Sequence, residues 1–226
     1  MNSSDLYALF RSDTRDTVAR YLWSEEEVWS YMADAQRMFV RLTGGVADVT
    51  SEVCEIPVVT GDPRAEMDKR ILRVMSATRR SDGRPIDVLN ATDLARRQTS
   101  DYGSLKPMLM DTSSGEVHSM VIGTQKGIVR WIKVPAADDF VDLHVYRLPL
   151  EVVSGADQEI ADVDEEHHYH LLAWMKALAY RKQDAETLDA QQAQTNEAVF
   201  RNYCAEVKAE WERYKHKTRV VAYGGL

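Results

Sequence analysis

Trp23-Ser24-Glu25-Glu26-Glu27-Val28-Trp29-Ser30-Tyr31-Met32-Ala33-Asp34-Ala35 is the stretch that sets the helical part of this fold. Ser24 and Glu27 have the spacing of a capping box, in which the serine hydroxyl accepts from the third helical N–H and the glutamate reaches back to the cap. Apolar residues then recur with helical spacing, at Val28, Met32, Ala35, Met38, Phe39 and Leu42. Since Gly44-Gly45 offers a left-handed stop, the pattern predicts an amphipathic helix over residues 25–42.

The segment before this helix predicts a shorter helix and a linker. Leu6, Leu9 and Phe10 fit a short amphipathic helix opened by Ser3 or Ser4, and residues 13–21 are typical of a linker.

Residues 49–148 have a pattern typical of β-strands, because β-branched residues alternate with polar ones and most of the Gly and Pro residues occur here. Residues 71–78 and 85–89 predict a hairpin around the turn at residues 81–84. A second hairpin is predicted from residues 117–124 and 128–134, and residues 140–146 form a third extended run. Residues 90–97 indicate a short helix between the hairpins.

After Pro149 the pattern becomes helical again. Residues 151–170 carry seven acidic side chains and no Lys or Arg, and the apolar face of Leu171, Trp174, Met175 and Leu178 continues a helix to about Lys182. A final long helix is predicted from a stripe that runs from Leu188 to Tyr214, and it ends in a basic segment at residues 213–219. The last residues, 220–226, are uncharged and read as an extended tail.

These elements predict an α+β chain with a helical body, an inserted antiparallel β-hairpin or sheet region and an extended C-terminal tail. We expect one composite domain with N-terminal helices in residues 1–48, a β-rich insertion in 49–149, a C-terminal helix pair in 150–218 and the tail in 219–226.

The composition excludes disordered, collagen-like and disulfide-rich proteins. The chain has 226 residues, 44% hydrophobic and 28% charged, and a formal net charge of 28 − 36 = −8, which is typical of an ordinary globular protein. The N-terminus lacks a signal-peptide pattern and no apolar run approaches the ~18 residues that span a bilayer, so we expect no membrane contact and synthesis in the cytoplasm. The two cysteines, Cys54 and Cys204, lie outside any metal or disulfide motif and are expected to be buried thiols.

The strongest candidate for chemistry is the run Asp164-Glu165-Glu166-His167-His168-Tyr169-His170. On a helix His167 and His170 share a face with Glu166, so a metal-dependent enzyme is one hypothesis. The spacing matches no established metal signature, however, and acidic residues at a helix start with histidines beside buried Leu171 and Trp174 explain the run more simply. We predict no metal and no cofactor.

Residues 64–97 are locally basic, with nine Lys or Arg against five acids. Nucleic acid is one possible target, but without interleaved aromatic residues a solvated face or a protein interface is favoured. Trp23 stands just before the Ser24 cap, where it could pack on Val28 as a hydrophobic staple or face a neighbouring subunit.

Three segments together resemble the head-to-tail adaptor (connector) proteins of tailed bacteriophages. They are the Trp23–Ala35 helix start, the hairpin close Val145-Tyr146-Arg147-Leu148-Pro149, and the Ala-rich helix Leu171–Tyr180 followed by Asp184 and the helix that contains Phe200. The resemblance implies a structural protein of the virion neck, without enzymatic turnover, that forms a ring of identical subunits, expected to be twelve-fold. It implies docking onto the portal, contacts to a tail tube, nozzle or fibre, and a conduit for genomic DNA without sequence-specific binding. A tail-completion or tail-terminator protein of the same neck is the alternative within phage structure.

In a ring each subunit presents two different faces, and the acidic residues 151–170 and basic residues 64–97 are candidates for complementary ones. Together with the tail, which could add a strand to a partner, they give a set of predicted interface residues: Trp23, Arg79, Arg80, Arg84, Asp164, Glu165, Arg213, Lys215, Lys217, Arg219, Tyr223 and Leu226.

Overall fold

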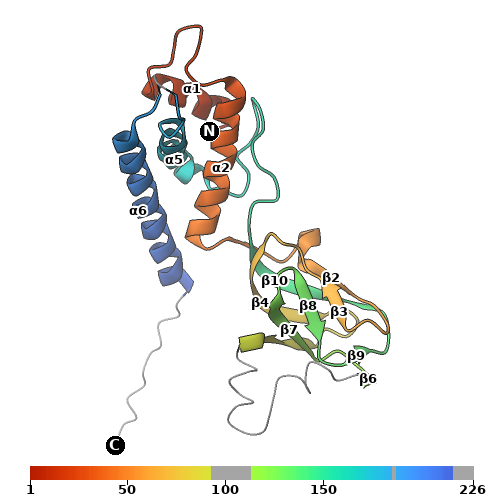
Figure 1. Ribbon diagram of the computed structural model, residues 1–226. Helices are drawn as coiled ribbons and strands as arrows, with labels where there is room; N and C mark the ends of the chain where they lie inside the picture. Colours follow the sequence, from red (N-terminus) through yellow and green to blue (C-terminus); the bar gives the residue numbers. More distant parts are fainter. Residues whose placement is uncertain (93–112, 185–186, 216–226) are drawn as a thin grey trace, which may run out of the picture. The chain divides into compact units, whose positions relative to one another are not determined.

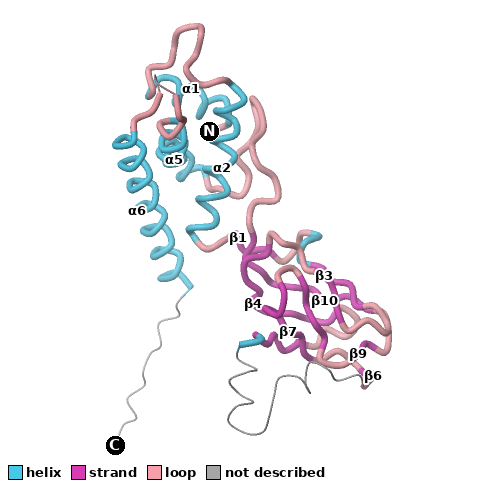
Figure 2. Tube along the Cα trace, in the orientation of Figure 1, coloured by secondary structure: helices cyan, strands magenta, loops and turns pink. Residues whose placement is uncertain are grey.

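The computed structural model describes residues 1–92, 113–184 and 187–215, and these divide into two compact units (Figure 1). The first, here called the helical unit, contains Met1–Gly44 and the described residues from Pro149 onward. The second, the β unit, contains the described residues of Gly45–Leu148. The class is α+β, as predicted, with helices and strands segregated along the chain (Figure 2).

The helical unit contains α1 (Ser3–Asp13), α2 (Glu25–Thr43), the 3-10 helix η2 (Glu165–His170), α5 (Leu171–Ala179) and α6 (Ala190–Lys215). Helix α2 begins where its sequence predicts and ends at Thr43, one residue past the predicted end. The Ser24 hydroxyl accepts from the Glu27 N–H and the Glu27 carboxylate accepts from the Ser24 N–H, while Gly44 closes the helix with φ +109°.

The prediction that Ser3 or Ser4 caps the N-terminus of α1 is wrong. Asn2 and Asp5 form a reciprocal capping box instead, with the Asp5 N–H 2.9 Å from the Asn2 side chain. The two serine hydroxyls bond to the loop of residues 150–164, Ser3 donating to the Gly155 carbonyl and Ser4 to the Asp157 carboxylate.

The predicted C-terminal helix pair is only partly present. Residues 150–164 form a loop, and α5 is short, ending at Ala179 and not at Lys182. The loop buries Val153, Ile160 and Val163, and Asp157 and Asp162 have left-handed backbone with φ of 56° and 63°, which an α-helix does not contain. Contacts of this loop with the rest of the helical unit, among them the bonds to Ser3 and Ser4, therefore win over local helix propensity. Helix α6 is long, as predicted.

The core of the helical unit lies between α1, α2, α5 and α6. Helix α5 packs on both α2 and α6. The largest fully buried side chains of the helical unit are Leu6, Phe10, Trp23, Met32, Phe39, Ile160, Leu171 and Phe200.

The β unit contains η1 (Glu52–Cys54) and the strands β1 (Val46–Asp48), β2 (Glu55–Val58), β3 (Arg64–Glu66), β4 (Ile71–Arg79), β5 (Pro85–Asn90), β6 (Ser114–Gly115), β7 (Ser119–Gln125), β8 (Ile128–Trp131), β9 (Val134–Pro135) and β10 (Asp139–Arg147). Eight of them form one sheet in the order β1-β10-β4-β5-β7-β8-β3, with β2 also paired to β10, and β6 and β9 form a separate pair. The sheet begins at Val46, three residues before the predicted β region.

Both predicted hairpins are confirmed, since β4 pairs antiparallel with β5 and β7 pairs antiparallel with β8. The prediction of an antiparallel sheet region is wrong at two places, because β5 and β7 run parallel and so do β6 and β9. The long separation is clearest for β5 and β7. Residues 91–118 separate these two strands, which is long enough for the crossover that a parallel pair requires. The helix predicted for residues 90–97 falls largely outside the described residues.

Alternating side chains of the strands build the core of the β unit. Met120, Val129, Trp131 and Val145 are fully buried in it, together with Cys54, Ile56 and Leu143. Both cysteines are buried free thiols, as predicted, and burial raises the pKa of Cys204 to about 12.

Candidate functional site

The predicted arginines of the β unit are engaged in ion pairs within that unit. Arg79 is 9% exposed and pairs with Asp82 and Glu116. Its guanidinium holds the pKa of the Asp82 carboxyl well below its usual range. Arg80 pairs with Asp142 and with Glu55, and it lies over the Phe140 ring at 5.1 Å.

Arg84 pairs with the same two carboxylates as Arg79. Its Nε lies 3.1 Å from Asp82, and a guanidinium nitrogen lies 3.7 Å from Glu116. The basic residues 79–84 are therefore largely neutralised by acids on neighbouring strands and turns. Their ion pairs join the end of β4 and the turn that follows it to β2 and β10, and so stabilise the β unit itself.

Trp23 lies inside the helical unit and is 1% exposed. Its indole Nε1 donates to the Ala179 carbonyl at 3.0 Å, and its ring meets Phe10 and Tyr180 edge-on. The side chain thus joins α1 to the end of α5, and in this chain it is not available to a neighbouring subunit.

Two of the three histidines of residues 167–170 contact Tyr203, and the third lies between backbone carbonyls. Nδ1 of His167 lies 2.8 Å from the Tyr203 hydroxyl, whereas His168 lies between the carbonyls of Met1 and Val163. His170 stacks on the Tyr203 ring at 3.5 Å, and burial together with the nearby His167 lowers its pKa.

These contacts attach η2 to α6 and to the chain start. Among the residues that the structure describes, no three His, Cys, Asp or Glu side chains gather as a metal site would require. The geometry therefore gives the metal hypothesis for His167 and His170 no support.

The remaining predicted interface residues are partly on the surface. Asp164 and Glu165 are exposed at the start of η2, where Glu165 pairs with the N-terminal ammonium at 2.6 Å. Arg213 and Lys215 are exposed in the last turn of α6. Lys217, Arg219, Tyr223 and Leu226 lie outside the described residues.

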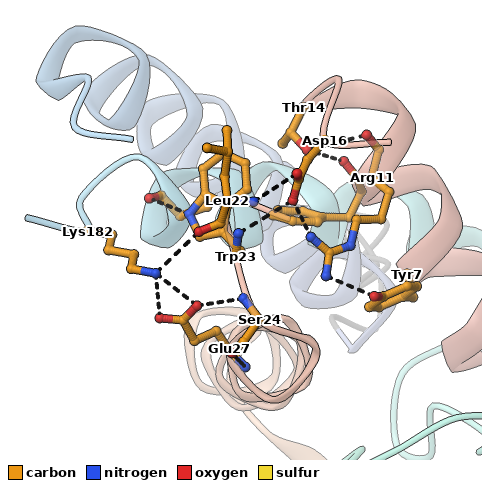
Figure 3. A network of polar contacts seen from close by, with 11 residues as sticks. Tyr7, Arg11, Thr14, Asp16, Leu22, Trp23, Ser24, Glu27 and Lys182 are labelled. Atoms are coloured by element: carbon orange, nitrogen blue, oxygen red, sulfur yellow. Dashed lines mark hydrogen bonds and ion pairs between the residues drawn. The ribbon is translucent and has the colours of Figure 1, made fainter. Parts of the chain in front are cut away.

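A polar network in residues 11–23 includes most of the segment that the sequence predicts to be a linker, residues 13–21 (Figure 3). Arg11 and Asp16 form a buried ion pair, 6% and 5% exposed. The Asp16 carboxylate also accepts from the N–H groups of Leu22, at 2.9 Å, and Trp23, at 3.4 Å. The only available signal was a charged pair five residues apart between two apolar segments.

Lys182, three residues past the end of α5, binds the same region. Its Nζ bonds the Glu27 carboxylate and lies 3.3 Å from the Leu22 carbonyl (Figure 3). Burial opposes ionisation of Glu27, but the bonds from Lys182 and Ser24 outweigh it and lower the pKa of that carboxyl.

Between these fixed ends the chain forms a surface feature that we call the arginine loop, residues 15–21. Val18 and Tyr21 are 76% and 50% exposed. Arg15 and Arg20 are exposed, have left-handed φ of 57° and 77°, and make no ion pair with any described residue. A rigid base thus presents apolar side chains and two unneutralised cations.

A second fixed feature lies in the loop of residues 150–164. Gln36 of α2 is fully buried, and its amide donates to the carbonyls of Glu151 and Ala161 and accepts from the Val153 N–H at 3.1 Å. A buried glutamine with all these bonds made holds the two arms of the loop together. Periodicity placed Gln36 on a helix but could not reveal a partner more than a hundred residues away.

The two arms enclose a surface hollow of about 530 Å³, which we call the acidic hollow. Its lining residues are Glu151, Val152, Ser154, Gln158, Glu159 and Ala161. The carboxylates of Glu151 and Glu159 are exposed and form no ion pair within the described part of the chain.

Comparison with known proteins gives one family. A family model described as SU10 adaptor protein matches residues 1–221. No curated protein matches the chain. Across residues 1–92, 113–184 and 187–215, none of the helices combines the length and apolar character needed to cross a bilayer.

Proposed function

Because the chain belongs to the SU10 adaptor protein family and is therefore a phage structural adaptor protein, we propose that it forms the head-to-tail adaptor ring, which docks onto the portal and joins the capsid to the tail. The observation that carries this proposal is the family match over residues 1–221, nearly the whole chain. In this role the protein is a component of the virion neck.

A ring requires each subunit to meet its neighbour through two different surfaces. The helical unit has two such surfaces of opposite charge, the arginine loop and the acidic hollow. We propose a homo-oligomeric ring, expected to be twelve-fold.

The proposed ring also lines a passage for genomic DNA. Binding to the duplex requires clustered cations that neutralise phosphates. The net charge of −8, with Arg79, Arg80 and Arg84 already paired to acids, supports a passage along which the duplex slides without sequence-specific binding.

Two parts of the chain suit contacts with two different kinds of partner. The uncharged residues 220–226 suit addition as a strand to an exposed sheet edge of the portal. The β unit is a separate compact body, which suits contacts to a tail tube, nozzle or fibre.

Imaging by electron microscopy tests the function directly. The full chain is purified alone and after mixing with the portal of the same phage. We expect rings seated on the portal, with one adaptor subunit for each portal subunit. Binding to isolated tail tubes and not to the portal would instead identify a tail-completion or terminator protein and overturn the proposal.

Truncation after Thr218 tests the role of the tail. Loss of residues 219–226 is expected to reduce portal binding at least about tenfold, because a strand of that length contributes several backbone hydrogen bonds of about 0.5–1.5 kcal/mol each. The helical and β units should unfold as in the full chain. Undiminished portal binding by the truncated chain would refute strand addition.

A further inference from the structure

We propose that the arginine loop of one subunit inserts into the acidic hollow of the next, so that this contact closes the ring. The inference rests on the proposed ring function and identifies the occupant of the hollow as residues 17–21 of a second copy of this chain. Within residues 17–20 no side chain makes a hydrogen bond or an ion pair to any described residue, which leaves them available for such a contact.

The two surfaces cannot meet within one chain. The arginine loop follows the last residue of α1, whereas the loop that forms the hollow bonds to Ser3 and Ser4 at the first turn of that helix. An α1 of 11 residues is about 16 Å long at 1.5 Å per residue. A loop at one end and a hollow at the other produce a head-to-tail contact, which repeats around a closed ring.

Charge and polarity match across the proposed contact. Arg15 and Arg20 have no acidic partner, and Glu151 and Glu159 have no basic one, among the residues described. The exposed Val18 supplies an apolar centre, for which the hollow offers Val152 and Ala161. An apolar centre surrounded by opposite charges is the usual composition of a specific protein interface.

Both surfaces are also held in shape before they meet. The buried Asp16 fixes the base of the loop, and the buried Gln36 fixes both arms of the hollow. Little conformational entropy is then lost on contact, which favours association.

Cysteine cross-linking tests the contact. The variant Val18→Cys/Ser154→Cys is assembled, on the portal if assembly requires it, and oxidised. We expect a ladder of disulfide-linked species beyond the dimer, whereas a mixture of the two single variants should give dimers only. The native Cys54 and Cys204 are 2% and 1% exposed and do not compete.

The single variant Val18→Cys should give no cross-link. Dimers from Val18→Cys alone would show that two arginine loops face each other, and would overturn the proposal. Rings that imaging finds assembled but that the double variant does not cross-link would also overturn it while leaving the ring function intact. Absence of rings with and without portal would overturn the proposed function as well.

An Arg20→Gly variant separates assembly from folding. Glycine relieves the left-handed backbone at φ 77°, so thermal stability should be unchanged or higher. Loss of the cation should raise the protein concentration needed for assembly at low salt by about three- to fivefold, and the difference should fade at high salt. Arg41→Gln removes the same charge from an exposed site on α2 and should leave assembly unchanged. Equal assembly of the Arg20→Gly and wild-type chains would contradict the contact.

Discussion

An Asp16→Ala variant is expected to lose about 3–5 kcal/mol of the free energy of unfolding of the helical unit, because it leaves the Arg11 cation buried without its counter-charge. The N–H groups of Leu22 and Trp23 lose an acceptor at the same time. The base of the arginine loop would then open, and assembly should weaken together with stability.

Urea unfolding followed by tryptophan fluorescence measures this effect. Trp23, Trp29, Trp174 and Trp211 belong to the helical unit, and only Trp131 to the β unit, so the signal reports mainly the helical unit. Asp13→Ala is the matched control, since its pair with Lys176 is partly exposed and its loss should cost no more than about 1 kcal/mol.

A double variant shows whether the unpaired cation is the cause. Arg11→Met/Asp16→Ala removes both charges and should be more stable than Asp16→Ala alone. If the double variant is equally unstable or less stable, the cost arises from the backbone N–H groups and not from the buried arginine.

An Asp48→Asn variant should destabilise the β unit by about 3–5 kcal/mol at pH 7. Asp48 and Arg147 are 7% and 6% exposed and form a buried ion pair between β1 and β10. Burial opposes ionisation of Asp48, but the bonds from Ser51, Arg147 and the Thr50 N–H outweigh it and lower the pKa of the carboxyl far below its usual range.

The lowered pKa also sets the pH dependence. A carboxyl with a depressed folded pKa stabilises the fold above its unfolded pKa of about 3.9, and this contribution is lost as the pH falls below that value toward the folded pKa. The wild-type β unit should therefore lose stability below about pH 4, whereas the Asp48→Asn variant should lack this part of the acid sensitivity.

Hydrogen exchange of peptides from β10 measures the stability of the β unit in the full chain, with peptides from α2 as the internal reference. Asp68→Asn is the control, because the Asp68–Arg70 pair is partly exposed and should contribute about 1 kcal/mol or less. Equal β10 protection in the Asp48→Asn and wild-type chains at pH 7 would contradict a stabilising role for the buried pair.

Most regular elements were predictable because their signals are local. The cap at Ser24 and Glu27, the apolar stripe of α2 and the stop at Gly44 all act within a few residues, and the structure contains each of them. The turns that close the β4–β5 and β7–β8 hairpins are equally local.

The failures have a common cause. Residues 150–164 carry helix-compatible side chains, but Gln36 bonds three of their backbone groups and the core takes up Val153, Ile160 and Val163. The cap at Asn2 differs from the predicted serines because the Ser3 and Ser4 hydroxyls bond to that same loop. Local propensity was overruled wherever a distant segment offered better burial or a better hydrogen-bond partner.

The sequence by itself determined the α+β class, the limits of α2, the two hairpins and the resemblance to phage adaptors, which the family match supports. Only the tertiary structure decided which charges remain available for partners. Arg79 and Arg80 looked like an interface but are paired within the β unit, whereas Arg15 and Arg20, in a segment read as a linker, are not paired. Whether a charge is neutralised depends on residues brought near by folding, and such long-range pairs leave no periodic trace along the chain.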